Sequence, residues 1–103
     1  MIPLKTIREL ISKHKVIEKE LSSGNIDKKD FAKKSKEYSV LNDIIDNAKE
    51  YENFEINKSE LEMIRNDNNN ELDIKNLAKN ELLALIEKNI FNEKKLKLFL
   101  LPK

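Results

Sequence analysis

The run Asn66–Asn70, with the sequence Asn-Asp-Asn-Asn-Asn, separates two long stretches that both have the residue spacing of an amphipathic helix. Asparagine and aspartate tolerate left-handed backbone and hydrogen-bond to nearby amides, so five in a row can reverse a chain without glycine. Because the reversal is short, the stretches on either side should lie antiparallel. This run therefore predicts a helical hairpin.

The stretch before the turn is predicted to form one long helix at about residues 28–66. Its apolar positions recur every three or four residues, at Phe31, Tyr38, Leu41, Ile45 and Ala48. Asp27 can cap its start. The pattern blurs at 53–59, and Ser59 and Glu62 have the spacing of a capping box, so a new helix could begin there. No glycine or proline enforces that break, and one continuous helix is preferred.

The stretch after the turn is predicted to form a helix at about residues 71–97. Its apolar positions are Leu72, Ile74, Leu77, Ala78, Leu82, Leu85, Ile86, Ile90 and Leu96. We expect four residues of the preceding helix to face it across the hairpin: Tyr38, Leu41, Ile45 and Ala48. The two helices then form a long antiparallel coiled coil.

A third helix is predicted near the start of the chain, at about residues 4–22. Its apolar stripe consists of Ile7, Leu10, His14, Ile17 and Leu21. Gly24 follows the stripe, as a left-handed helix cap would. The predicted fold is all-α, with three helices, two of them a long antiparallel coiled-coil hairpin and the first across one end of it.

The composition excludes several classes of function. The chain has 103 residues, no cysteine, one glycine and a net charge of +1. Zero cysteine removes disulfides and thiolate chemistry, and one glycine removes glycine-rich phosphate loops. Only Arg8 and Arg65 are arginine, so bidentate phosphate clamps are scarce. No apolar run approaches the length of a membrane span, so we expect no membrane partner and a cytoplasmic protein.

For each side chain that could serve in catalysis or metal binding, we prefer a structural interpretation. His14, the single histidine, falls on an apolar stripe and is predicted to be partly buried rather than catalytic. The stretch Asp67–Glu71 superficially resembles a calcium loop, but the required glycine and glutamate are replaced by Leu72 and Ala78. We therefore predict no catalytic residue, no metal site and no cofactor.

Two further patterns are interpreted as incidental. The stretch Asn57–Ser59 fits a glycosylation sequon, although nothing suggests secretion. Paired carboxylates, such as Asp43 with Asp46 or Glu60 with Glu62, are common on helix surfaces and lack a pocket or a nucleophile beside them.

Lysines gather in three places: Lys28-Lys29, Lys33-Lys34-Lys36 and Lys94-Lys95-Lys97. In an antiparallel hairpin these clusters could meet at one end and form a surface for an acidic partner or RNA. A solvated helix face is preferred, because aromatic residues for base stacking are not interleaved with the lysines.

Three stretches carry a resemblance to a known family. Residues 30–41, DFAKKSKEYSVL, resemble an element early in bacterial class I peptide chain release factors that contains S-K-E-Y. Residues 71–82, ELDIKNLAKNEL, and residues 98–103, LFLLPK, are similar to later patterns of the same helical domain, in the same order. The L-L-P-K ending favours the type that reads UAA and UAG over the type that reads UGA.

The resemblance implies an N-terminal helical domain at residues 1–97 and a stub at 98–103 that leads into a further domain. The family's Gly-Gly-Gln and Pro-x-Thr motifs for peptide release and codon reading do not occur in this sequence. The implied role is therefore a ribosome-positioning arm, not an enzyme. It would face the ribosomal stalk base and the class II release factor GTPase.

Two alternatives remain open: a transfer-RNA-binding helical arm, as in seryl-tRNA synthetases, and a free-standing coiled-coil adaptor. The near-neutral charge counts against the first, and the apolar stub against the second. That stub consists of Leu98, Phe99, Leu100 and Leu101. In the whole protein we expect it to enter the next domain as a strand. In the isolated chain it could fold back, but weak self-association is favoured.

Overall fold

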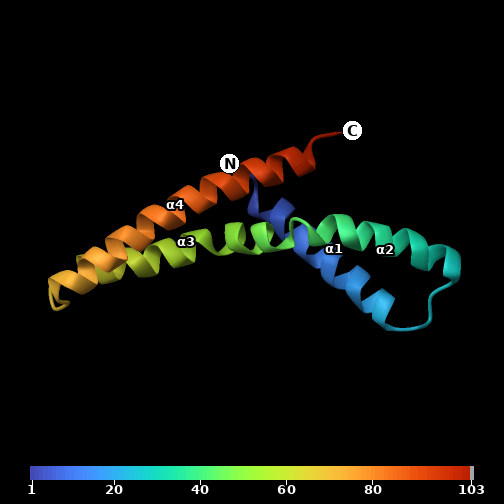
Figure 1. The fold of residues 1–103 in the computed structure, drawn as a ribbon, viewed down its shortest axis with the longest axis horizontal. Coiled ribbons are helices and arrows are strands. Elements are labelled where there is room, and N and C mark those ends of the chain that lie inside the picture. Colours follow the sequence, from blue (N-terminus) through green and yellow to red (C-terminus); the bar gives the residue numbers. More distant parts are fainter. Residues whose placement is uncertain (103) are drawn as a thin grey trace.

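The computed structural model describes residues 1–102, which form four α-helices and no strand. They are α1 (Leu4–Ser22), α2 (Lys28–Asn42), α3 (Ile45–Asn66) and α4 (Leu72–Leu100) (Figure 1). The predicted all-α class and the bounds of the first helix are confirmed. The predicted number of helices is wrong, because the long helix expected at 28–66 is two helices.

The break between α2 and α3 lies at Asp43 and Ile44, not at 53–59. Ile44 has φ −119° and ψ −1°, far from the values of a regular α-helix, and its amide donates to the Leu41 carbonyl at 3.1 Å, which makes a tightened turn. The six residues from Asn42 to Asn47 are Asn-Asp-Ile-Ile-Asp-Asn, all of them mediocre helix formers. The chain therefore breaks without glycine or proline.

The break allows the two helices to pack against different partners. α2 lies beside α1, whereas α3 runs beside α4 (Figure 1). Ile44 and Ile45 are both buried, with 4% and 5% of their surface exposed. Neighbouring residues on a regular helix point about 100° apart, so a local change in the backbone helps both to reach the interior.

The reversal at residues 67–71 joins α3 and α4 as an antiparallel hairpin, as predicted. The Asn69 amide donates to Asp67 Oδ1 at 2.9 Å, and Asn70 Nδ2 donates to the Ile64 carbonyl at 3.0 Å. Within residues 1–102, positive φ occurs at Gly24 alone. The asparagine run therefore acts through side-chain hydrogen bonds and not through left-handed backbone.

The core lies where the start of the chain, α1, α3 and the end of α4 meet. Its buried side chains are Ile2, Ile7, Ile44, Ala48, Tyr51 and Leu96, with Leu10, Ile11 and Phe99 packed against them. The prediction that Ala48 faces the last helix is therefore confirmed. The same prediction is wrong for Tyr38, whose ring stacks on His14 of α1.

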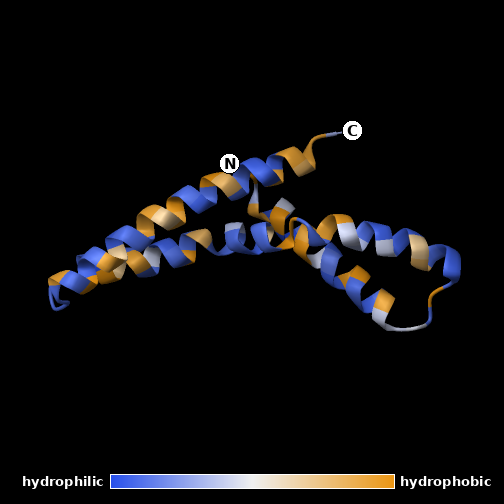
Figure 2. Cartoon of the chain, viewed as in Figure 1, coloured by the Kyte–Doolittle hydropathy of each residue, from blue (hydrophilic) through white to orange (hydrophobic). Residues whose placement is uncertain are grey.

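The last helix is longer than expected and continues to Leu100, so residues 98–100 are helical here and not extended. Phe99 packs on the core, whereas Leu98 is 70% exposed. The outer half of the hairpin is thinly packed: α4 buries only Ala78 and Leu82 there. Figure 2 shows apolar residues along the whole of α4, and many of them are exposed.

Candidate interaction surface

A layer of polar side chains crosses the seam between α3 and α4. Asn47 Nδ2 donates to Asn92 Oδ1 at 2.9 Å, and Asn92 Nδ2 donates to Glu50 Oε2 at 2.9 Å. Asn92 is 2% exposed and Asn47 is 8% exposed. Asn89, one turn away, has a buried Oδ1 with no hydrogen-bond partner. This layer fixes how the two helices align, since buried polar groups must meet their partners.

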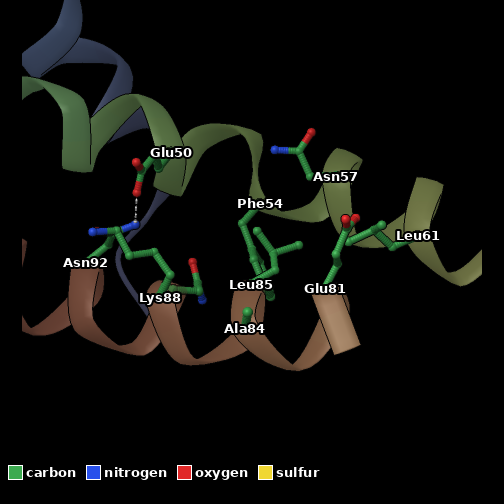
Figure 3. Close-up of a pocket in the computed structure, with 10 residues that line it drawn as sticks. Glu50, Phe54, Asn57, Leu61, Glu81, Ala84, Leu85, Lys88 and Asn92 are labelled. Atoms are coloured by element: carbon green, nitrogen blue, oxygen red, sulfur yellow. Dashed lines mark hydrogen bonds between the residues drawn. The ribbon is translucent and has the colours of Figure 1, made fainter. Parts of the chain in front are cut away.

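A hollow of about 440 Å³ lies beside this layer, between α3 and α4 (Figure 3). Its apolar wall comes from Phe54, Leu61, Ala84 and Leu85, and its polar groups include Glu50, Glu81, Lys88 and Asn89. None of the side chains that line it is a hydroxyl or thiol nucleophile paired with a base. The hollow therefore lacks the pair of nucleophile and base that covalent catalysis by a serine, threonine or cysteine uses.

Tyr51 ties the start of the chain to both helices of the hairpin. The amide of Ile2 donates to the Tyr51 hydroxyl at 3.1 Å, and this hydroxyl donates to Glu93 Oε1 at 3.2 Å. Burial raises the pKa of Tyr51. The Met1 amino group lies 3.2 Å from Glu93 Oε1, and its hydrogen bond lowers the pKa of Glu93.

The side chain of His14, on α1, is buried against the end of α2, which confirms its predicted burial. Its Nε2 lies 3.0 Å from Asn42 Oδ1, and its ring stacks on Tyr38 with the ring centres 4.8 Å apart. The Tyr38 hydroxyl donates to Glu18 Oε2 at 2.8 Å, and this bond raises the pKa of Tyr38. The contacts of His14 link helices, which is a structural role.

The carboxylate pairs and the sequon lie on helix surfaces. Asp43 follows the last residue of α2 and Asp46 is in the first turn of α3. Glu60 is exposed on α3, and Glu62 lies 3.9 Å from the Arg65 guanidinium. The Asn57–Ser59 stretch is within α3. Among residues 1–102, no three His, Cys, Asp or Glu side chains gather closely enough to hold a metal ion.

The three lysine clusters do not meet at one end. Lys28 and Lys29 begin α2 at the tip of the α1–α2 pair, away from the end of α4 (Figure 1). Lys34 pairs with Glu20, and Lys97 lies 3.7 Å from Glu93.

Lys33 and Lys36 instead border a groove of about 360 Å³ together with Lys13 of α1. The apolar residues of the groove are Val40, Leu41 and Phe99. The sequence pattern did not predict that Lys13 and Phe99 line this groove, because the break between α2 and α3 determines how α1 and α2 lie relative to the end of α4.

Comparison with known proteins finds similar sequences over nearly the whole of this chain. It is 58% identical to peptide chain release factor 1 of Pelagibacter ubique (strain HTCC1062) over 103 residues, which are 100% of this chain and 29% of that protein. It is 41% identical to release factor 1 of Wolbachia pipientis subsp. Culex pipiens (strain wPip) over 99 residues, 94% of this chain and 27% of that protein. This chain is a homologue of part of release factor 1.

A third release factor 1, from Bartonella quintana (strain Toulouse), is 31% identical over 102 residues, 99% of this chain and 28% of that protein. The chain thus spans less than a third of the length of these release factor 1 relatives. No family model matches it, and no solved structure is significantly similar. The resemblance inferred from sequence motifs is confirmed.

The motif stretches that resemble release factors lie on three parts of the fold. Residues 30–41 are on α2, residues 71–82 cover the start of α4, and residues 98–102 cover its last turn and the two residues after it. The first and last stretches meet at the groove, through Lys33, Lys36, Val40 and Leu41 from one side and Phe99 from the other. Within residues 1–102, no helix is both long and apolar enough to cross a membrane.

Proposed function

We propose that this chain is the N-terminal helical arm of a peptide chain release factor that acts in translation termination at UAA and UAG codons. The observation that carries the proposal is the 58% identity to a release factor 1 along the whole chain. The domain is residues 1–97, and 98–103 lead into the parts of the factor that read the codon and trigger release. The factor works in the cytoplasm.

The arm positions the factor on the ribosome and performs no chemistry itself. An elongated shape, 60 × 30 × 19 Å, supports this role, because such a body can reach a distant surface. The seam hollow supports it as well, since its lining offers no nucleophile with a base. The proposed partners are the stalk-base region of the ribosome and the class II release factor GTPase, and the role requires no cofactor.

A chimera tests this proposal. The segment of Pelagibacter ubique release factor 1 that matches this chain is replaced by the chain, and peptide release is measured on ribosomes stalled at UAA, UAG and UGA. We expect release at UAA and UAG close to that of the parent factor, with little at UGA.

Two controls complete the test. A factor that lacks the segment altogether should release more slowly than the chimera, and the isolated chain should release no peptide. A chimera that is folded but no better than the truncated factor would contradict the positioning role. Release of peptide by the isolated chain would contradict the view that it performs no chemistry.

A further inference from the structure

The groove between the α1–α2 pair and the end of α4 has an apolar floor and a basic rim. Leu41, 5% exposed, lies deepest, Val40 is 43% exposed, and half-buried Phe99 closes the groove from α4. Its volume, about 360 Å³, is at the small end of the ~300–1,000 Å³ range of ligand pockets. The floor therefore suits one or two apolar side chains of a partner rather than a cofactor.

The rim of this groove carries an excess of positive charge. Lys13, Lys33 and Lys36 stand around it, with Glu37 the single carboxylate among the residues that line it. No carboxylate within residues 1–102 lies within ion-pair distance of these three ammonium groups. Their charges are thus available to a partner, and an acidic partner is complementary.

We propose that this groove is a docking site for an acidic, amphipathic peptide segment of a partner protein. One or two leucine or phenylalanine side chains of that segment enter the floor over Leu41 and Phe99. Its aspartates and glutamates pair with Lys13, Lys33 and Lys36. In peptide recognition, buried apolar anchors commonly provide most of the affinity, whereas charged groups at the rim orient the partner and raise the association rate.

A protein partner fits this groove better than RNA. Phosphate and base recognition favours the planar guanidinium of arginine, but Arg8 lies 3.3 Å from Glu52 and Arg65 is at the far end of α3. Single-stranded RNA also needs stacking platforms. Phe99 is the only aromatic residue that lines the groove, and the neighbouring Tyr38 already stacks on His14.

The inference deepens the proposed function, on which it rests in taking this chain to be an interaction module, and it names the chemistry of one partner. The two can fail separately. Peptide binding at the groove in a chimera that fails in termination would overturn the proposed function alone, and an active chimera whose groove binds no acidic peptide would overturn the docking site alone.

The test uses the 103-residue chain and a short fluorescent peptide in which Glu and Asp alternate with Leu and Phe. Binding is followed by fluorescence anisotropy at low and high salt, and its position by the amide NMR shifts of the isotope-labelled chain. We expect saturable binding that weakens with salt, with the largest shifts around Val40, Leu41 and Phe99. The same peptide with Lys in place of Glu and Asp should not bind.

Variants locate the site. The double variant Lys33→Glu/Lys36→Glu should weaken binding about tenfold, since it reverses two charges on the rim. The matched control, Lys28→Glu/Lys29→Glu, makes the same change on the same helix outside the groove and should stay within about twofold of wild type. Val40→Asp should also weaken binding, whereas Val16→Asp, at a similarly exposed position on α1, should not.

Three results would overturn the proposal. One is equal weakening by the groove and control variants, and another is NMR shifts that fall elsewhere on the chain. The third is tighter binding at the groove by a uridine-rich single-stranded RNA than by the acidic peptide, because this would assign the surface to nucleic acid. Thermal melting of each variant confirms that lost binding is not lost folding.

Discussion

Leu96 and Leu98 are two positions apart on α4 and have opposite environments. Leu96 is fully buried in the core, whereas Leu98 is 70% exposed. Leu96→Ala should lower the free energy of unfolding by about 2–5 kcal/mol, because it leaves a cavity among close-packed neighbours. Leu98→Ala is the matched control and should stay within about 0.5 kcal/mol of wild type. Urea denaturation followed by circular dichroism measures both, and equal losses would show that the core is misplaced.

The raised pKa of Tyr51 predicts how the free energy of unfolding changes at alkaline pH. Burial raises its pKa above the ordinary value in the folded chain. The folded state therefore binds the phenolic proton more tightly than the unfolded state, and this contribution is complete below the unfolded pKa of about 10. The contribution is lost as pH rises from that value through the folded pKa.

Tyr51→Phe removes this dependence together with two hydrogen bonds of the hydroxyl. At neutral pH we expect the variant to be less stable by about 0.5–1.5 kcal/mol. Above pH 10 the difference in stability should shrink. Only wild type has the Tyr51 phenol, and ionising this group costs more in the folded state than in the unfolded state. Tyr38 is present in both proteins, so its contribution cancels. A constant difference across pH 7 to about 11 in chemical denaturation would contradict the prediction.

The burial of a single residue was predictable from sequence only where its chemical type and its position in the apolar pattern both indicated burial. The burial of His14 followed from its position on the stripe of α1. Asn47 and Asn92 could not be found in the same way, because asparagine on a helix usually indicates solvent. Asn92 in fact continues the inward face of α4, three residues from Asn89 and four from Leu96. That spacing was the available signal for a buried polar layer.

At the scale of elements, the long helix predicted at 28–66 shows the limit of periodicity. Tyr38, Leu41, Ile45 and Ala48 keep a three-and-four spacing across the break at Asp43 and Ile44. The spacing remains regular although the partner changes from α1 to the end of α4. Helix propensity could have indicated the break, since six mediocre helix formers follow one another at residues 42–47. The ends of α1 and the asparagine turn were predictable because local chemistry determines them.

The pairing of α3 with α4 can be tested at its polar layer. Asn92→Ala should cost about 1–3 kcal/mol, because Asn47 Nδ2 and Glu50 each lose a partner inside the seam. The double variant Asn47→Ala/Asn92→Ala should cost less than the sum of the two single variants, which would demonstrate direct coupling. Asn76→Ala, at an exposed position of α4, is the control. Additive losses, measured by urea denaturation, would show that the two asparagines do not interact.

The whole molecule is far from compact. Its radius of gyration is 18.3 Å, against about 13 Å for a globular chain of this length. Its accessible surface is 7854 Å², against about 6,000 Å² for a compact monomer of its mass. The elongated hairpin was predictable from helix lengths and the short turn. The tilt of the α1–α2 pair was not, since it depends on the break.

Self-association through the end of α4 remains a prediction. Leu98 and Leu101 are 70% and 60% exposed, whereas Phe99 packs on the core. We expect the wild-type chain to associate weakly at high concentration and the variant Leu98→Ser/Leu101→Ser to remain monomeric. Sedimentation velocity across micromolar to millimolar concentrations measures both. A chain cut after Lys97 is a poor control, because it also removes Phe99, and monomeric wild type at all concentrations would end the idea.

The core joins residues from opposite ends of the sequence, and this has a consequence for the order of events during synthesis. Ile2 and Ile7 leave the ribosome first, but Leu96, which completes their packing, is added several seconds later at ~5–20 residues per second. Until then α1 can pack against α2 and α3 but not against the end of α4. The nascent chain must therefore leave uncovered the part of this apolar surface that Leu96 and Phe99 later occupy, and a chaperone can hold it there until the last helix is made.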